Sequence, residues 1–349
     1  MGEPLEIQEN VSLAPFTTFK IGGKARFFAE VVNKDELIAA LKFASVNSLP
    51  VFVLGGGSNI LVSDGGFKGL VIKIAITGID RTDNSDGAVD LTVGSGESWD
   101  GLVKYCVDQN LAGIECLSGI PGSVGGTPVQ NVGAYGQEVS ETIISVACLD
   151  RTTNNVRKFE NAECGFAYRR SIFNTTSKDL FVVLAVRIRL KFGGAAKIAY
   201  KELKDRFIDD VPTLDAVRKE VLKIRRAKSM VVDDNDPNSR SAGSFFKNPI
   251  VTVEEHRRLE IQFGSIPRFT VDCEHVKIPA AWLIENAGIS KGFSFNRAGV
   301  SENHTLAIIN RDDAHASDVI ELKEHIQKAV NDKYGIELHP EPLFIGNVP

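Results

Sequence analysis

The sequence predicts an α+β protein built from two or three domains. Its 349 residues, 43% hydrophobic and 24% charged, have the composition of a globular protein with well-developed cores. In the first part of the chain, short apolar runs typical of strands alternate with runs of helical periodicity. After residue 243, helices and short strands follow one another in a segment with the size of a separate α+β domain.

The chain up to residue 75 reads as an α/β unit. Residues 36–50 have helical periodicity and end at a proline. The apolar run 51–54 predicts a buried strand, and the glycine run 55–59 that follows it predicts a turn. A second strand is expected over 70–75.

The middle of the chain continues with strand and helix patterns around a glycine-rich segment. Alternation predicts a strand over 89–96, and Ser98 is a candidate N-cap for a helix over 98–110. The runs 141–150 and 155–159 predict a hairpin. The remaining elements expected here are a strand over 180–190 and a helix over 213–228.

A polar loop over 231–243 is a plausible joint before the last domain. The elements expected after it are strands over 244–251, 304–310 and 343–346 and helices over 252–264, 279–288 and 316–335.

Charge, hydropathy and cysteine usage exclude several classes of protein. The net charge of −5 does not support a nucleic-acid-binding surface, and no apolar run approaches the length of a membrane span. The five cysteines are scattered without a C-x-x-C pair, and the six histidines show no H-E-x-x-H spacing. We therefore expect a cytoplasmic protein with reduced thiols and no metal site.

Four basic residues gather near the end of the helix expected over 213–228. They are Lys223, Arg225, Arg226 and Lys228. This cluster is either a solvated helix face or a clamp for phosphate.

The segment "LGGGSN" (54–59) follows a strand, where ligands sit in α/β units. Glycine allows the main chain to approach an anion, and serine and asparagine add donors. The segment is either such a cradle or only a tight turn. Ile60 stands where a dinucleotide fingerprint needs its third glycine, and the chain has no P-loop motif, so both of those sites are rejected.

The segment "PGSVGGTPVQNVGAYG" (121–136) holds five glycines and two prolines and is long for a connection. Its backbone would suit an extended anionic ligand, and the alternative is a flexible surface loop. Pro121 occupies the first glycine position of a G-x-S-x-G elbow, so a hydrolase triad is not supported.

Six motifs occur in one order along the chain. They are "TTFKIGGKA" (17–25), "LGGGSNIL" (54–61), "IPGSVGGTPVQNVGAYG" (120–136), "FAYRRSIF" (166–173), "GSFFKNP" (243–249) and "HPEPLFIG" (339–346). From about residue 12 to 346 the chain thus resembles the UDP-N-acetylenolpyruvoylglucosamine reductase family.

The resemblance implies an FAD-binding module of the vanillyl-alcohol-oxidase (PCMH) type with two subdomains, over 1–80 and 81–230. A C-terminal α+β domain over 231–335 would bind the substrate, and a strand over 336–349 would return with a catalytic glutamate. The second subdomain would carry a tyrosine loop that closes over the substrate, as in one subclass of the family.

The resemblance also implies the reaction. NADPH would reduce non-covalently bound FAD, and the flavin would reduce UDP-N-acetylglucosamine enolpyruvate to UDP-N-acetylmuramate, for peptidoglycan synthesis. A monomer is expected, with no nucleic-acid or membrane partner.

Residues matching the family's motifs are expected to form three sets. The catalytic set is Arg169, Ser244 and Glu341. The substrate set is Tyr135, Tyr168, Tyr200, Lys228, Asn248 and His304. The cofactor set is Gly55, Gly56, Gly57, Ser58, Asn59, Gly122, Ser123, Gly125, Gly126, Thr127 and Val132. Two features depart from the family: the loop over 229–242 is longer, and Leu343 replaces an arginine found in some members.

The implied chemistry suits the catalytic set. Arg169 can pair bidentately with the substrate carboxylate as charge develops. Spacing alone would favour a structural ion pair for this arginine, and the match to the motif reverses that preference. Glu341 lies between two prolines; buried near an anion its pKa would rise, whereas a solvated strand end is the simpler reading. Ser244 would give its proton to carbon, because the enolate that it meets is strongly basic.

Two alternatives remain from the sequence. One is another flavin oxidoreductase of the same fold; no histidine precedes His256, so a histidyl link to FAD in the N-terminal module is excluded and only a cysteine link stays open. The other is a nucleotide-sugar-binding protein without catalysis, which would need no FAD cradle.

Overall fold

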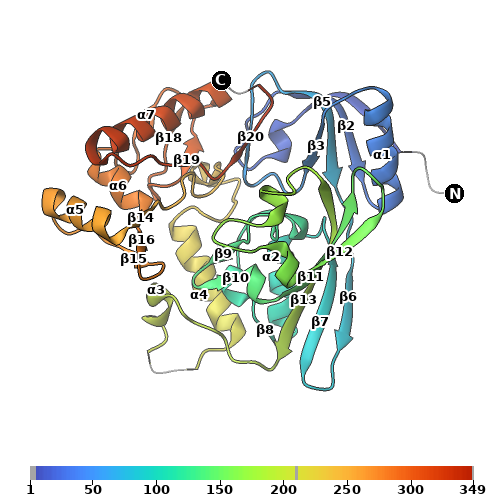
Figure 1. The fold of residues 1–349 in the computed structure, drawn as a ribbon, viewed down its shortest axis with the longest axis horizontal. Coiled ribbons are helices and arrows are strands. Elements are labelled where there is room, and N and C mark those ends of the chain that lie inside the picture. The colour runs from blue at the N-terminus through green and yellow to red at the C-terminus, as the bar shows by residue number, and fades with distance from the viewer. Residues whose placement is uncertain (1–4, 209–210, 348–349) are drawn as a thin grey trace. The chain divides into compact units, whose positions relative to one another are not determined.

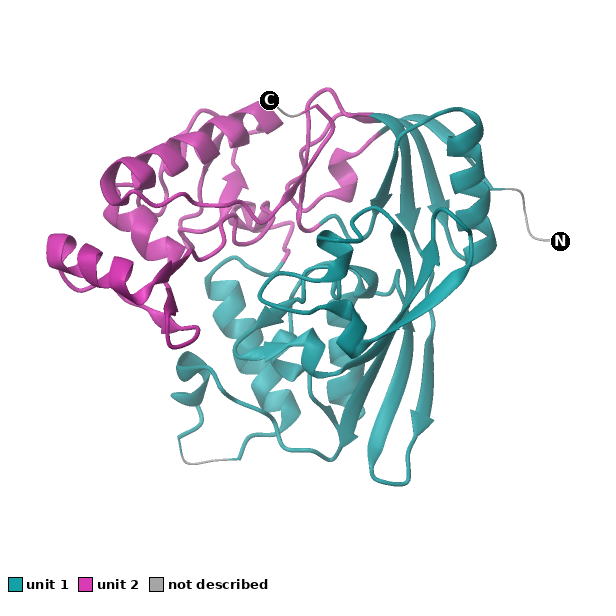
Figure 2. Ribbon diagram, viewed as in Figure 1, with its two compact units in different colours: residues 1–11, 25–57, 68–231 teal, residues 12–24, 58–67, 232–349 magenta. Residues whose placement is uncertain are grey.

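A computed structural model describes residues 5–208 and 211–347. The chain forms two compact units, each made of segments that are separated in the sequence (Figure 2). Unit 1 comprises residues 1–11, 25–57 and 68–231, and unit 2 comprises residues 12–24, 58–67 and 232–349. Figure 1 gives the labels of the elements.

Unit 1 contains a four-stranded sheet in the order β1-β2-β5-β3. Its strands are β1 (Gln8–Ser12), β2 (Lys24–Val31), β5 (Phe67–Ile74) and β3 (Val51–Leu54), and α1 (Lys34–Val46) accompanies them. Leu37, Ala40 and Ala44 of α1 share one apolar core with residues of β2 and β5. The helix is therefore held on the sheet by its buried apolar face.

A second, larger sheet of unit 1 has the order β12-β11-β13-β7-β6, with β8 also paired to β13. Its strands are β6 (Ile79–Asp83), β7 (Ala88–Gly94), β8 (Leu111–Ala112), β11 (Ile143–Asp150), β12 (Val156–Glu160) and β13 (Phe181–Phe192). The other elements of unit 1 are α2 (Trp99–Asp108), α3 (Lys201–Lys204), α4 (Leu214–Ala227), and the short pair β9 (Gly133–Ala134) and β10 (Gln137–Glu138).

Unit 2 packs three helices and three small sheets around one apolar core. Its helices are α5 (Val253–Phe263), α6 (Ala280–Asn286) and α7 (Ala316–Tyr334). Its sheets are β14 (Ile250–Thr252), β16 (His275–Lys277) and β15 (Phe269–Thr270); β17 (Ser294–Phe295), β18 (Ala298–Val300) and β19 (Ile308–Asn310); and β20 (Leu343–Ile345) paired in parallel with β4 (Ile60–Val62).

Every helix predicted from the sequence is confirmed, with ends that differ by a few residues. The side chain of Ser98 accepts a hydrogen bond from the amide of Gly101 and so caps α2, as expected. The predicted hairpin is also confirmed, since β11 and β12 pair antiparallel.

Two strand predictions are wrong over most of their length. The run 244–251 is a strand only from Ile250, because Gly243 has a φ of +75° and Pro249 has no N–H to donate. The run 304–310 is a strand only from Ile308, because a turn from His304 to Ala307 precedes it. The sequence prediction has no counterpart for strands β1, β2, β4 and β6, nor for the two- and three-residue strands β8, β9, β10, β15, β16, β17 and β18.

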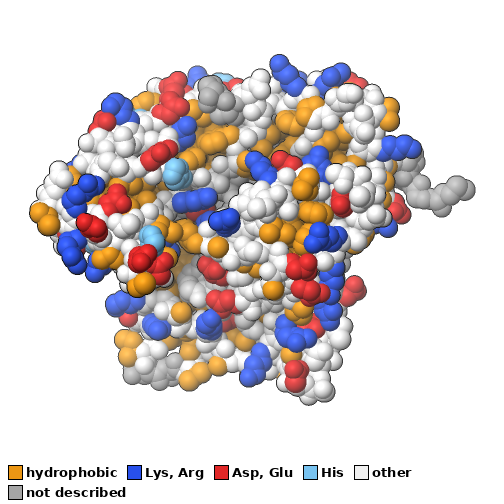
Figure 3. Space-filling view, viewed as in Figure 1, with side chains coloured by type: hydrophobic (Ala, Val, Ile, Leu, Met, Phe, Trp, Pro, Cys, Tyr) orange, Lys and Arg blue, Asp and Glu red, His pale blue; other side chains and the backbone are white. Residues whose placement is uncertain are grey.

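No helix within residues 5–208 or 211–347 is long and apolar enough to cross a membrane. On the face drawn in Figure 3, basic and acidic side chains are interspersed. Among the described residues, no group of histidine, cysteine, aspartate or glutamate side chains could hold a metal ion.

Candidate functional site

The two glycine-rich segments touch through their backbones in unit 1. A Cβ atom on Gly56 would lie 2.4 Å from the Cα of Gly122 and 2.8 Å from the nitrogen of Ser123. A Cβ atom on Gly55 would lie too close to the hydroxyl oxygen of Ser123, at 2.8 Å, whereas a Cβ atom on Gly126 would lie 4.0 Å from the same oxygen. Glycine is thus needed at Gly55 and Gly56, where the segments meet, and space remains beside Gly126, as a cradle for an anionic ligand requires.

The second glycine-rich segment is fixed in place, so the surface-loop interpretation is wrong. The amides of Val124 and Gly125 donate to the carbonyls of Glu97 and Ser95, both at 2.9 Å. Thr127 is buried and its hydroxyl donates to the carbonyl of Val124 at 2.8 Å.

Two consequences follow for the predicted cofactor set. Both donors of Thr127 are already used within the segment, because its hydroxyl and its amide donate to the carbonyl of Val124 at 2.8 and 3.1 Å. Val132 is half-buried, and its amide donates to the carbonyl of Thr127 at 3.1 Å. The segment therefore presents a rigid backbone to any ligand that it binds.

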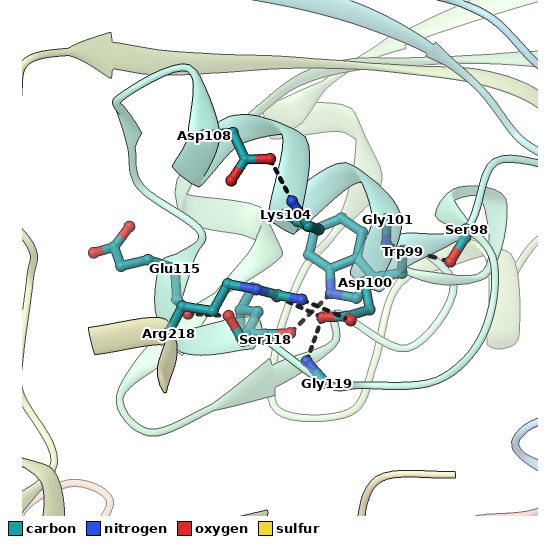
Figure 4. A network of polar contacts seen from close by, with 11 residues as sticks. Ser98, Trp99, Asp100, Gly101, Lys104, Asp108, Glu115, Ser118, Gly119 and Arg218 are labelled. Atoms are coloured by element: carbon teal, nitrogen blue, oxygen red, sulfur yellow. Dashed lines mark hydrogen bonds and ion pairs between the residues drawn. The ribbon is translucent and has the colours of Figure 1, made fainter. Parts of the chain in front are cut away.

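An ion-pair network anchors the start of this segment (Figure 4). Asp100 of α2 accepts two hydrogen bonds from Arg218 of α4, at 2.6 and 2.9 Å, and a third from the amide of Gly119 at 2.5 Å. Burial alone would raise the pKa of Asp100, but the bonds from Arg218 and Gly119 outweigh it and lower the pKa. The two helices and the glycine-rich segment are thus held together by one carboxylate.

Arg169 lies in a turn of unit 1 with a strained backbone. Its φ is +53°, a left-handed value that a long side chain rarely adopts. One guanidinium nitrogen donates to the carbonyl of Gly133 at 3.1 Å, and the guanidinium lies 5.3 Å from the centre of the Tyr168 ring. The turn therefore places Arg169 against the glycine-rich segment, with the ring of Tyr168 beside its guanidinium.

Three residues of the predicted substrate set come together elsewhere in unit 1. The rings of Tyr135 and Tyr200 pack edge to face, 5.5 Å apart. Lys228, which ends α4, forms an ion pair of 2.8 Å with Glu202 of α3. Burial raises the pKa of Tyr135 to about 12, so its phenol stays protonated at neutral pH.

Arg225 is a residue whose burial the sequence analysis missed. Its side chain is only 7% exposed, and burial lowers its pKa. One guanidinium nitrogen donates to the carbonyl of Met230 at 2.6 Å, whereas its Nε has no hydrogen-bond partner among the described residues. Its burial could have been predicted from the helical spacing, because Val217 and Val221, which precede it at intervals of four residues, are also buried on the same helix face.

The basic cluster is therefore divided. Lys223 and Arg226 are exposed, as a solvated helix face predicts, whereas Lys228 is half-buried in its ion pair with Glu202. The solvated-face interpretation is wrong for Arg225.

In unit 2 the structure brings together the segments that carry Ser244 and Glu341, although 97 positions separate these residues in the sequence. The amide of Glu341 donates to the carbonyl of Phe245 at 2.8 Å, and Phe246 bridges to Pro340. Both Ser244 and Glu341 are half-buried. Phe245 and Phe246 are buried in the core and hold this backbone in place.

Asn59 joins the same constellation from the segment over 58–67. Its side-chain amide donates to the carbonyl of Glu341 at 3.2 Å, and its own carbonyl accepts from the amide of Leu343 at 3.0 Å. Ser58 belongs to the same segment of unit 2, whereas the glycines at 55–57 belong to unit 1. The side chain of Leu343 is 42% exposed.

The other two substrate candidates of unit 2, Asn248 and His304, both follow Ser244 in the sequence. The side-chain oxygen of Asn248 accepts from the amide of Ala280 at 2.9 Å and thereby caps α6. His304 is half-buried, and its carbonyl accepts from the amide of Ala307 at 3.0 Å.

Comparison with known proteins gives matches over nearly the whole chain. Residues 236–345 match the family of the UDP-N-acetylenolpyruvoylglucosamine reductase C-terminal domain, and residues 25–157 match an FAD binding domain family. A UDP-N-acetylenolpyruvoylglucosamine reductase from Thermobifida fusca is 43% identical, covering 97% of each chain. The reductase of Streptomyces coelicolor is 40% identical, covering 99% of this chain and 91% of its own.

A solved structure agrees with these matches. The UDP-N-acetylenolpyruvylglucosamine reductase of Thermus caldophilus superimposes with a TM-score of 0.68 at 26% identity, covering 98% of this chain and 99% of its own. Together with the FAD-binding match, this likeness confirms the predicted α+β fold with an FAD-binding module.

Proposed function

Because the chain belongs to the UDP-N-acetylenolpyruvoylglucosamine reductase family, we propose that it reduces UDP-N-acetylglucosamine enolpyruvate to UDP-N-acetylmuramate with electrons from NADPH. Membership makes the chain an FAD-containing reductase of peptidoglycan precursor synthesis. The observation that carries the finer proposal is the hydrogen bond that joins the segments of Ser244 and Glu341.

The residues present fit the cofactor. Gly126 leaves space beside the hydroxyl of Ser123, Gly55 lets the first segment approach that hydroxyl closely, and the backbones of both glycine-rich segments can turn N–H groups toward a diphosphate. FAD held there would supply the hydride chemistry between NADPH and the terminal carbon of the enolpyruvyl group. We assign the cradle to the glycines of these segments, with Ser58 and Asn59 as further donors.

Arg169 is proposed to stabilise the charge that develops on the substrate carboxylate. A guanidinium forms two parallel, charge-assisted hydrogen bonds with a carboxylate, and its strained backbone and its bond to Gly133 restrict its orientation. An interaction that strengthens as charge develops accelerates the reaction rather than only binding the substrate.

Ser244 and Glu341 are proposed to complete the reaction at the neighbouring carbon. The hydroxyl of Ser244 donates the proton, and Glu341, protonated beside the substrate, hydrogen-bonds to the enolic oxygens. The support is their adjacency: the backbone of Glu341 is bonded to that of Phe245, the residue after Ser244.

The predicted substrate set is proposed to contact the nucleotide-sugar. Its members are Tyr135, Tyr168, Tyr200, Lys228, Asn248 and His304. The packing of Tyr135 on Tyr200 beside Lys228 supports this for three of them. Asn248 would contact the substrate through its amide nitrogen, because its oxygen caps α6. We further propose that the enzyme acts as a cytoplasmic monomer.

An anaerobic experiment separates the two halves of the reaction. The purified protein, loaded with FAD, is reduced by NADPH, and UDP-N-acetylglucosamine enolpyruvate is then added while the flavin absorbance is followed. Reduction on the first addition and reoxidation on the second are expected. A flavin that NADPH reduces but the enolpyruvyl substrate never reoxidises would exclude this substrate.

Ser244→Ala should block only the second half. Removal of a general acid lowers a rate by about 10²–10⁴-fold, so reoxidation should slow by that factor while reduction by NADPH is retained. Ser294→Ala, an exposed serine of the same unit, is the control and should behave as wild type. Reoxidation of Ser244→Ala at the wild-type rate would refute the role of Ser244.

A further inference from the structure

A carboxylate that the proposed function does not use is paired with one of the proposed substrate residues. The side-chain oxygen of Glu202 lies 2.8 Å from the ammonium of Lys228. Both side chains are about one-third exposed, at 35% for Lys228 and 36% for Glu202. The pair is therefore accessible to a ligand and can be broken without unfolding a core.

The pair belongs to the tyrosine cluster. Glu202 lies in the short helix α3, whose first turn follows Tyr200, and the amides of Leu203 and Lys204 donate to the carbonyl of Tyr200. The negative charge of Glu202 helps to raise the pKa of the Tyr135 phenol, and so does the neighbouring Tyr200. Lys228 is thus neutralised by a residue of the same turn that places Tyr200 against Tyr135.

We propose that Glu202 is an internal competitor for the substrate, occupying Lys228 with a carboxylate until an anionic group of the nucleotide-sugar replaces it. The inference rests on the proposed function, which makes Lys228 a substrate contact. It adds a residue that tunes affinity and specificity: Lys228 becomes available only to a ligand whose anion out-competes the carboxylate.

Charge explains why a nucleoside diphosphate can replace Glu202 and a neutral ligand cannot. A nucleoside diphosphate carries more negative charge than one carboxylate and can bond the ammonium through several oxygens. A neutral sugar cannot replace Glu202 and leaves the ion pair closed. Partly exposed ion pairs of this kind contribute little, so the competition should lower the affinity for the substrate by about two- to fivefold.

The test measures binding of the reaction product, UDP-N-acetylmuramate, to the oxidised FAD-loaded protein by perturbation of the flavin spectrum. Glu202→Gln keeps the size of the side chain and removes its charge, so the dissociation constant should fall by about two- to fivefold. The matched control is Asp205→Asn, which removes an exposed carboxylate from the end of the same helix, where it is paired with Lys201. This control should leave the dissociation constant unchanged.

A double-mutant cycle with Lys228→Met separates the inference from its premise. Lys228→Met should weaken binding of the product, and the gain from Glu202→Gln should vanish in the double variant, because no ammonium remains to be released. If Lys228→Met binds the product as tightly as wild type, the lysine is no substrate contact and the inference falls with that assignment.

If Lys228→Met weakens binding but Glu202→Gln does not tighten it, the assignment of Lys228 stands and the competition is refuted. Equal tightening by Glu202→Gln and Asp205→Asn would also refute it, because the effect would then be the net charge of α3 rather than the ion pair.

Discussion

At the scale of single residues, the neighbours Arg169 and Arg170 allow a sharp test. Lysine is a point charge without the planar fork of arginine, so Arg169→Lys should slow flavin reoxidation by the enolpyruvyl substrate by about 100-fold. Arg170→Lys is the control, since Arg170 is exposed and should tolerate the change. Stopped-flow absorbance of the reduced protein gives both rates. Equal rates for the two variants would contradict the role of Arg169.

The sequence could select Arg169 only through its motif, because two adjacent arginines look alike to pattern and charge. The structure separates them by the left-handed backbone of Arg169 and its bond to Gly133. For Asn248 the motif predicts a substrate contact but not the structural role. Its side chain caps α6 by accepting a hydrogen bond from Ala280, and no local sequence pattern relates these two residues.

Glu202 was not selected from the sequence for the same reason. It is one of many charged residues, and only the fold brings α3 beside the end of α4, where Lys228 lies. Side chains that act through a distant partner have no spacing signal of their own.

At the scale of elements, Asp100 joins α2, α4 and the start of the glycine-rich segment (Figure 4). Asp100→Asn removes the charge and should destabilise the fold by about 1–2 kcal/mol at pH 7, a value reduced because Asp100 is about one-third exposed. The control is Asp108→Asn in the exposed pair with Lys104, which should change stability by less than about 0.5 kcal/mol. Urea unfolding measures both.

The pH dependence of stability provides a second test of Asp100→Asn. The pKa of Asp100 is lowered in the folded protein, so the carboxylate stabilises the fold at pH values above its unfolded pKa, about 3.9. This contribution is lost as the pH falls through the lower folded value. The stability difference between wild type and Asp100→Asn should thus be constant from pH 7 to about pH 5 and shrink below about pH 4. A difference that grows on acidification would contradict the assignment.

Helices were predictable because periodicity and caps are local. Thr213 accepts from the amide of Ala216 and begins α4, and Gly335 ends α7 in a left-handed conformation, both as short-range rules require. The composition of the stretch from Ser244 to Pro249 is typical of a strand. The stretch nevertheless forms isolated backbone hydrogen bonds to residues near 306 and 340 instead of the continuous hydrogen-bond ladder of a sheet. Composition does not contain that information.

At the scale of the whole molecule, the order of motifs predicted the family, whereas the division into units was beyond the sequence. Residues 58–67 belong to unit 2 because β4 pairs in parallel with β20, and because Asp64 accepts hydrogen bonds from the amides of Ala316 and Ser317 at the start of α7. Such pairings join residues more than 250 positions apart, as between Asp64 and Ser317. The predicted boundary between two FAD-binding subdomains at residues 80–81 stays a prediction.

How the chain holds FAD can be tested on the holoprotein. No histidine precedes His256, and the cysteines of unit 1 are all buried, with pKa values that burial raises to about 12; they are Cys106, Cys116, Cys148 and Cys164. A thiol must ionise to attack, so these side chains are poor candidates for a covalent link. Acid precipitation should therefore leave the flavin in the supernatant.

Cys273 is the exposed cysteine of unit 2, so Cys273→Ser tests whether this thiol holds the flavin covalently. It should release flavin as completely as wild type does.

Non-covalent binding also ties occupancy to stability: free FAD at 100 times its dissociation constant should add about 2.7 kcal/mol to the free energy of unfolding. The midpoint of thermal unfolding should thus rise with FAD concentration. Flavin that stays with the precipitate, together with a midpoint insensitive to added FAD, would show a covalent link.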